Sequence, residues 1–155
     1  MAVKPIPDGY HSITPYLVVP GVAKLLDFLK QAFGAELTHP PMTKPDGTVM
    51  HAEVQIGDSR IMMADEFPEM GFLSPLTVGG SPVMMHLYVE DVDATANKAV
   101  AAGAKVTKPV ADQFYGDRGG QLQDPFGHNW YVSTHKEDVS PEEVKERSAK
   151  LYGGA

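Results

Sequence analysis

The sequence predicts an α+β fold built from two tandem βαβββ modules. Three observations lead to this prediction. A strand pattern is followed by a helix pattern and three further strand patterns, this order occurs twice, and the two halves share a sequence repeat at a nearly constant offset. The predicted segments are a first module at residues 10–66, a connector at 67–81, a second module at 82–136, and a C-terminal helix and tail at 137–155.

The repeat is clearest where each predicted helix ends. Residues 34–40 read GAELTHP and residues 103–109 read GAKVTKP, so four of these seven positions are identical at an offset of 69 residues. A second match relates residues 17–22 to residues 87–92 at an offset of 70 residues. Chance similarity between helix ends explains part of this pattern, whereas duplicated supersecondary units explain both matches.

The elements of the first module follow from spacing and turn residues. Apolar residues recur at helical spacing after the first strand, and Gly34 then ends the helix. A loop at residues 40–47 precedes two β-rich segments, and Gly57, Asp58 and Ser59 between those segments favour a tight hairpin. The expected elements are a strand, a helix, a short strand and the two hairpin strands, at residues 12–19, 20–33, 35–39, 48–56 and 60–65.

The second module repeats this order. Asp91 is expected to cap the start of its helix, and Gly103 to end it. After the module, Ser140, Pro141 and Glu143 have the spacing of a capping box, which predicts a C-terminal helix. The expected elements of the module are a strand, a helix and three strands, at residues 82–89, 91–102, 105–110, 114–123 and 128–134.

The composition restricts the class of protein. The 155-residue chain is 43% apolar and 21% charged, which is ordinary for a globular protein. It contains no cysteine, so a metal site would have to use His, Asp, Glu or weaker donors. The net charge of −7 disfavours nucleic acid as a partner, because neutralising phosphates requires clusters of Lys and Arg. Residues 1–10 lack the apolar run of a secretory signal and no stretch resembles a membrane helix, so a cytoplasmic location without membrane attachment is expected.

Several short runs carry a family resemblance. They are DPFGH (124–128) before the last strand, YHSITPYL (10–17), MHAE (50–53), THKED (134–138) and SPEE (140–143). Together with the paired modules, these runs resemble the vicinal-oxygen-chelate superfamily, and within it a largely uncharacterised bacterial glyoxalase-like subgroup. The superfamily includes glyoxalase I, extradiol dioxygenases, fosfomycin resistance enzymes and bleomycin-binding proteins. The resemblance spans about residues 10–146 and predicts the fold more strongly than the reaction, because this fold hosts unrelated functions.

The resemblance implies the glyoxalase/bleomycin resistance/dihydroxybiphenyl dioxygenase fold. In this fold the modules form a curled mixed sheet with helices on the convex face and a ligand cavity on the concave face. Because alternate residues of a strand share a face, the apolar set of each strand should pack on the helices and the more polar set should line the cavity. Arg118 is a candidate to bind a carboxylate or phosphate at the cavity mouth. The candidate ligand-binding residues are Thr14, Tyr16, His51, Glu53, Met84, His86, Tyr88, Arg118 and Tyr131.

Metal-dependent members of the superfamily place ligands early in the first strand of each module and near the middle of the last strand. The resemblance carries these positions onto Thr14, Met84 and Tyr131. None of the three is a divalent-metal ligand of ordinary strength, because such a site needs His or carboxylate. We therefore expect no metal cofactor at these positions.

A rearranged site is the alternative. His51 and Glu53 lie two residues apart on a predicted strand and share a face, and His86 faces the cavity from the other module. These three residues are candidates for a Zn, Fe or Mn site, or for general acid–base catalysis. They also fit a polar cavity wall with hydrogen-bonded histidines. Surface or capping roles are expected for the remaining histidines, which are His11, His39, His128 and His135.

Two functions remain open. The first is a small-molecule binding protein of the bleomycin-resistance type that holds a cationic or aromatic compound without a metal. The missing ligands, the acidic charge and the aromatic residues Tyr16, Tyr88 and Tyr131 favour it. The second is an isomerase, lyase or dioxygenase that acts on a small oxygenated metabolite through the histidine–glutamate set named above.

The connector predicts how two copies associate. Its apolar side chains should not all lie in water together, since an exposed patch of that kind usually marks an interface. They are Phe67, Met70, Phe72, Leu73 and Leu76. We expect a homodimer whose cavities are completed across the subunit interface, and the alternative is a lid over the cavity of the same chain.

Overall fold

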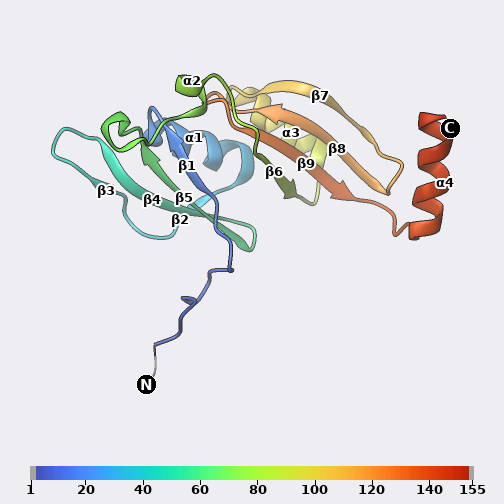
Figure 1. Ribbon diagram of the computed structural model, residues 1–155, viewed down its shortest axis with the longest axis horizontal. Coiled ribbons are helices and arrows are strands. Elements are labelled where there is room, and N and C mark those ends of the chain that lie inside the picture. Colours follow the sequence, from blue (N-terminus) through green and yellow to red (C-terminus); the bar gives the residue numbers. More distant parts are fainter. Residues whose placement is uncertain (1–2, 154–155) are drawn as a thin grey trace.

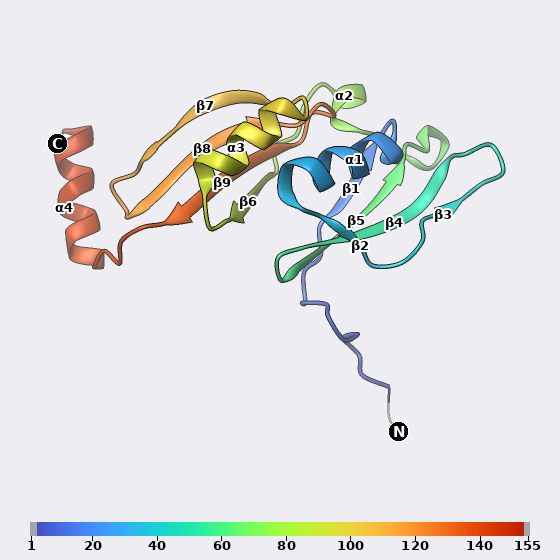
Figure 2. The ribbon, with the colours of Figure 1, turned by 180° about the vertical axis from the view of Figure 1, so that it is seen from behind.

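The computed structural model describes residues 3–153 and places two β-sheets side by side, with helices α1 and α3 on the same face of the molecule (Figures 1 and 2). Residues 1–2 of the N-terminal segment and residues 154–155 of the predicted tail lie outside the described part of the chain. Within residues 3–153 neither sheet closes into a barrel. The α+β fold of two βαβββ modules expected from the sequence is confirmed.

The first module contains helix α1 (Val22–Phe33) and five strands. The strands are β1 (Tyr16–Val19), β2 (Glu36–Leu37), β3 (Met42–Thr43), β4 (Val49–Ile56) and β5 (Ser59–Asp65). Their order in the sheet is β1-β5-β4-β2, and β3 also pairs with β4. Strands β1 and β5 are parallel, whereas β4 is antiparallel to β2, β3 and β5.

The second module has the same topology. It contains helix α3 (Val92–Ala101) and strands β6 (Met84–Tyr88), β7 (Lys105–Asp112), β8 (Asp117–Gln123) and β9 (Asn129–His135). The order is β6-β9-β8-β7, with β6 parallel to β9. Tyr16 pairs with Met62 and His86 pairs with Tyr131, so Tyr16 and His86 occupy equivalent positions in the two modules.

Several elements differ from the sequence-based expectation. Strand β1 begins at Tyr16, after Pro15, which has no N–H to offer a ladder. The predicted loop at 40–47 contains β3, which is hydrogen-bonded to β4. Strand β8 begins at Asp117, because a turn precedes it in which the Gly116 N–H donates to the carbonyl of Gln113. The connector contains two short helices, η1 (Pro68–Met70) and α2 (Pro75–Val78).

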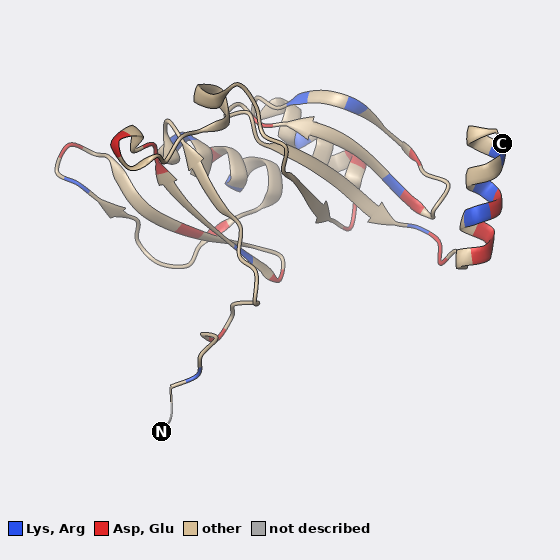
Figure 3. Cartoon of the chain, in the orientation of Figure 1, with Lys and Arg blue, Asp and Glu red and all other residues tan. Residues whose placement is uncertain are grey.

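The predicted helix ends are confirmed. Gly34 ends α1 in the left-handed region with φ of 66°. The side chain of Asp91 accepts a hydrogen bond from the Ala94 N–H at the start of α3. Helix α4 (Pro141–Tyr152) lies beyond the end of the second sheet and carries charges of both signs (Figures 1 and 3). Its cap, Ser140, accepts from the Glu143 N–H, as expected.

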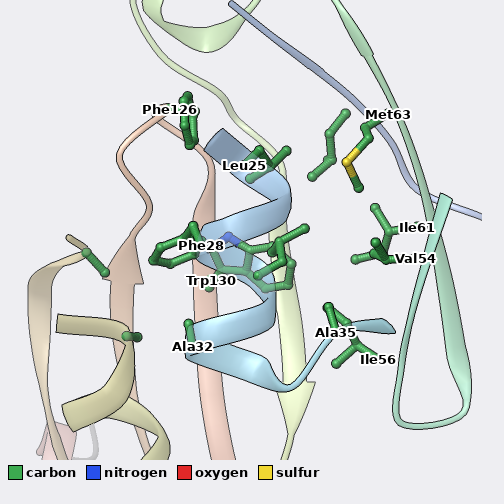
Figure 4. Packing of buried hydrophobic residues seen from close by; sticks show 14 of the residues in the cluster. Leu25, Phe28, Ala32, Ala35, Val54, Ile56, Ile61, Met63, Phe126 and Trp130 are labelled. Carbon is green, nitrogen blue, oxygen red and sulfur yellow. The ribbon is translucent and has the colours of Figure 1, made fainter. Parts of the chain in front are cut away.

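The two modules share one hydrophobic core between the sheets and the packed helices α1 and α3. Leu25 of α1 and Met63 of β5 are fully buried there, and Phe28 of α1 and Trp130 of β9 belong to the same cluster (Figure 4). The rings of Phe33 and Trp130 have centroids 4.8 Å apart. Helix α1 therefore fixes the first module against the second.

The DPFGH run shapes the approach to the last strand. The buried carboxylate of Asp124 accepts hydrogen bonds from the N–H groups of Phe126 and His128 through one oxygen. Its other oxygen accepts from the indole N–H of Trp130 at 3.0 Å. The turn and the core tryptophan are thus held by a single side chain.

No helix within residues 3–153 combines the length and the apolar character that crossing a lipid bilayer requires.

Candidate functional site

Strand alternation gives each sheet two distinct faces. On β6, Met85 and Leu87 pack against the core. Met84, His86 and Tyr88 alternate with them and are exposed on the opposite face. We call the side of each sheet that faces away from α1 and α3 its open face. As expected, the apolar set of β6 packs on the core, but residues of both sets line the cavity described below.

A hydrogen-bonded cluster lies on the open face of the first module. Nε2 of His51 donates to Oε1 of Glu53 at 2.8 Å, and both residues belong to β4. The hydroxyl of Tyr16 is hydrogen-bonded to Nδ1 of His51 at 3.1 Å. The hydroxyl of Tyr10 donates to the other carboxylate oxygen of Glu53. Glu53 is only 6% exposed, so its carboxylate depends on these partners.

His39 joins this cluster from the loop that follows β2. Strand β2 pairs with β4 through Leu37 and Val54, and the Thr38 N–H then donates to the carbonyl of Glu53 at 3.1 Å. This pairing carries the chain past Glu53, so the ligand atoms of His39, His51 and Glu53 lie within 4.8 Å of one another. Although His39 is exposed, it lies beside the candidate site and not at an unrelated strand end.

The cluster shifts the acidity of two of its members. Burial acts to raise the pKa of Glu53, but hydrogen bonds from His51 and Tyr10 outweigh it, and the pKa lies below its usual value. For Tyr16, burial and the nearby charge of Glu53 raise the pKa above its usual 10.0. Glu53 is therefore ionised at neutral pH, whereas Tyr16 keeps its proton.

An aromatic cluster occupies the open face of the second module. The rings of His86 and Tyr88 are stacked with centroids 4.6 Å apart, and the ring of Tyr131 meets His86 at 4.9 Å. Nε2 of His86 is hydrogen-bonded to Oγ of Ser133 at 2.6 Å. The hydroxyl of Tyr88 donates to the buried carboxylate of Asp117 at 2.9 Å. His86 is thus held by neighbours from its own module.

A cavity of about 620 Å³ lies between the modules, lined by the first strand of each. Four of the predicted ligand-binding residues line it, namely Thr14, Tyr16, Met84 and His86. The indole of Trp130 also contributes to its wall. Tyr16 belongs to both features, since it lines the cavity and is hydrogen-bonded to His51.

The charge of the cavity differs from that of the whole chain. None of the described residues that line it is acidic, and the polar ones include Arg60, His11 and His128. Strands β1 and β6 carry no Lys, Arg, Asp or Glu (Figure 3). The acidic net charge is thus located elsewhere and gives no reason to expect a cationic ligand in this cavity.

The structure differs from the sequence-based expectation for two candidate residues, His86 and Arg118. His86 does not complete a ligand set with His51 and Glu53, because among residues 3–153 the clustered set is His39, His51 and Glu53. The reason is that His86 belongs to the other sheet. Arg118 is already paired with the carboxylates of Asp93 and Asp112, at 2.8 and 3.2 Å. Its charge is therefore neutralised by the chain itself.

The positions that hold metal ligands in metal-dependent members of the superfamily do not fit a metal here. Thr14 offers a hydroxyl and Met84 a thioether, both on the cavity wall. The phenol of Tyr131 is hydrogen-bonded to the hydroxyl of Tyr115 at 3.1 Å. These neutral donors are poor ligands for the divalent ions that His and carboxylate hold.

Four residues of the clusters were missed by sequence reasoning: Tyr10, His39, Tyr115 and Asp117. Asp117 accepts from Tyr88 and is hydrogen-bonded to His135 at 2.7 Å. Asp117 lies within the strand expected at residues 114–123 and is the only one of the four that belongs to a strand in the structure, so strand period could have assigned its face. The others lie before β1 or in loops, where no period assigns a direction.

Comparisons with known proteins agree with this architecture. The family model for the Glyoxalase/Bleomycin resistance protein/Dioxygenase superfamily matches residues 9–132. A Mycobacterium bovis protein named Uncharacterized protein Mb0911c is 39% identical over 138 residues, which is 86% of this chain and 90% of that protein.

Solved structures show the same fold. TioX from Micromonospora sp. ML1 is 23% identical with a TM-score of 0.61, covering 84% of this chain and all of TioX. A mutant of the fosfomycin resistance protein FosX from Listeria monocytogenes, solved with Mn(II) and 1S,2S-dihydroxypropylphosphonic acid, is 17% identical with a TM-score of 0.59. That match covers 87% of this chain and 94% of FosX. Since the family match spans both modules, the chain belongs to the Glyoxalase/Bleomycin resistance protein/Dioxygenase superfamily.

Proposed function

We propose that this protein binds an apolar or aromatic small molecule in the cavity between β1 and β6, without a metal at Thr14, Met84 and Tyr131. The observation that carries the proposal is the cavity itself, which has the volume of a small-molecule site and is lined by both modules. Apolar walls supply most of the binding energy in such sites, and a few polar groups set the orientation of the ligand. Here those groups are Tyr16, Arg60 and His86.

The charge expected of the ligand follows from the residues that line the cavity. Because the described lining residues include Arg60 and no carboxylate, an anionic or neutral compound fits better than a cationic one. The ring of Tyr10 stacks 4.4 Å from the guanidinium of Arg60 and holds it in place. The sequence-based expectation was a cationic or aromatic compound, and the proposal keeps the aromatic ligand in preference to the cationic one.

The test uses the fluorescence of Trp130, which is the single tryptophan of the chain and lines the cavity. Three aromatic probes are titrated: anionic anilinonaphthalene sulfonate, neutral phenylnaphthylamine and cationic thioflavin T. We expect saturable binding of the first two, and about tenfold weaker binding of the anionic probe by Arg60→Gln. Lys24→Ala, on the exposed side of α1, is the matched control. Failure of all three probes to change Trp130 emission would contradict the proposal.

A second candidate function is acid–base catalysis on a small oxygenated metabolite. It is favoured by the hydrogen-bonded chain Glu53–His51–Tyr16, which ends on the cavity wall. Such a chain is suited to moving a proton at a carbon next to a carbonyl. The test is exchange of carbon-bound hydrogen in dihydroxyacetone in D₂O, followed by NMR. Exchange that is faster with the protein than with His51→Ala supports it, and equal rates exclude it for this compound.

The proposal includes a homodimer in the cytoplasm, in which each cavity is lined by the two modules of one chain and not, as the sequence-based expectation had it, completed across the subunit interface. The dimer is supported by the apolar side chains that the single chain leaves exposed on the connector, which include Met70 at 68% and Leu76 at 57%. Isologous contact of two connectors would cover them.

A further inference from the structure

We propose that His39, His51 and Glu53 bind a first-row divalent transition-metal ion, of the Zn²⁺ and Fe²⁺ class, on the open face of the first module. Their ligand atoms already lie within 4.8 Å of one another. Two imidazoles and one carboxylate are the donor set that these ions prefer. Such ions hold N and O ligands at about 2 Å in tetrahedral geometry, which puts the ligand atoms about 3.3 Å apart, so the three atoms have to approach one another by at most about 1.5 Å.

The backbone fixes two of the ligands and lets the third adjust. His51 and Glu53 are two residues apart on β4 and therefore project from the same face. His39 follows β2, whose pairing with β4 continues through the bond from the Thr38 N–H to the carbonyl of Glu53. His39 is exposed and lies outside the strands, so its ring can move onto an ion without disturbing the sheet.

In each of the three residues, one polar atom of the side chain is hydrogen-bonded to a residue outside the set. Nδ1 of His51 is hydrogen-bonded to the hydroxyl of Tyr16 at 3.1 Å. Nδ1 of His39 is hydrogen-bonded to Oγ1 of Thr38 at 2.8 Å. The outer oxygen of Glu53 accepts from Tyr10. An ion would take the place of the proton that Nε2 of His51 shares with Oε1 of Glu53, and His39 would offer its other ring nitrogen. Partners of this kind orient the ligands of metal sites.

The charge of the site also favours a cation. Glu53 is buried, and within residues 3–153 its ion pair is with His51. An ionised carboxylate in such a place is costly unless a positive charge compensates it. A divalent ion supplies that charge.

The duplication gives an internal comparison. Pairing in the sheets makes Gly119 and Gln121 of β8 equivalent to His51 and Glu53 of β4. The sequence repeat, at its offset of 69 residues, makes Lys108 equivalent to His39. None of these three counterparts is an ordinary ligand of such an ion. The donor set is thus particular to the first module and does not follow from the fold. It is also distinct from the positions of Thr14, Met84 and Tyr131, because His51 and Glu53 belong to β4.

The experiment uses the tag-free full chain after treatment with a chelator. It is titrated with Co²⁺, read by visible d–d absorption, and with Zn²⁺, read by calorimetry. We expect one ion per chain, with binding weakened at least about tenfold in His39→Ala and in His51→Ala. Binding should also be weakened in Tyr16→Phe, because the Tyr16 hydroxyl orients the ring of His51. His39→Ala changes an exposed loop residue, so it tests the site without risk to the fold.

His135→Ala is the matched control, since it removes an exposed histidine of the second module that does not line the cavity. Unchanged binding in this variant supports the assignment. Substoichiometric binding by the wild type, binding that survives both His39→Ala and His51→Ala, or binding lost in His135→Ala would overturn it. The inference is independent of the cavity proposal. Probe binding measured by Trp130 fluorescence on the same metal-free samples reports on the cavity alone, so either proposal can fail without the other.

Discussion

Nε2 of His51 lies 2.8 Å from Oε1 of Glu53, two residues along the same strand. The pair is continued on one side by Tyr16, which lines the cavity between the modules, and on the other by Tyr10 from the segment before β1. A buried carboxylate is thereby connected to the wall of a cavity through an imidazole and a phenol. This arrangement can orient a ligand, move a proton or, with His39, hold a cation.

Replacing Glu53 with Gln is expected to destabilise the protein at pH 7 by about 1–3 kcal/mol, because His51 and Tyr10 lose a charged acceptor. The effect depends on pH. The folded-state pKa of Glu53 is lowered, so its contribution is present above the unfolded pKa and is lost as pH falls through the folded pKa. The free energy of unfolding, measured with urea from pH 7 down to pH 3, should differ less between wild type and variant as the pH falls. A difference that stays constant would contradict the assignment.

Replacing Asp124 with Ala is expected to lower the free energy of unfolding by about 2–3 kcal/mol, since buried donors of the backbone and of Trp130 lose their acceptor. The change should also alter the emission of Trp130, whose indole N–H is bonded to Asp124 at 3.0 Å. Asp27→Ala, on the exposed side of α1, is the control and should stay within about 0.5 kcal/mol of wild type. Equal stability of the two variants would show that the DPFGH carboxylate has no structural role.

The pKa of His135 is expected to lie above its usual value of 6.5, because Asp117 and Asp138 hydrogen-bond its two ring nitrogens. For a histidine with a raised pKa, the stabilising contribution is present below the unfolded pKa and is lost as pH rises through the folded pKa. NMR titration of the ring C–H signals between pH 5 and 9 measures it. Asp138→Asn should lower the value and Asp8→Asn should leave it unchanged. A wild-type value at or below 6.5 would refute the prediction.

Sedimentation velocity at micromolar concentration should show a dimer, because the single chain leaves Phe72, Leu73 and Leu76 of the connector exposed. Replacing Phe72 and Leu76 with Ser should shift the equilibrium towards monomer. Val100→Ser, which changes an exposed apolar residue of α3, is the control. A wild-type species of 16.8 kDa, the mass of one chain, would reject the dimer.

Local sequence was sufficient for most of the fold. Apolar spacing located α1, turn residues located the hairpin of β4 and β5, and Gly34 and Asp91 marked helix ends that the structure confirms. These features depend on contacts a few residues apart, which is why the sequence alone predicts them. The two-residue period of a strand likewise places His86 and Leu87 on opposite faces.

The tertiary structure alone decided which functional side chains meet. Strand period places His51 and Glu53 on one face, but only the pairing of β2 with β4 brings His39 beside them. Strand period also turns His86 towards the cavity, which is why the sequence-based expectation groups it with His51 and Glu53. It belongs to a different sheet, however, and its ring stacks on Tyr88. The sequence thus determined the modules, their helix ends and the faces of their strands. The membership of the site depended on which distant segments pair, and periodicity within a segment carries no information about that.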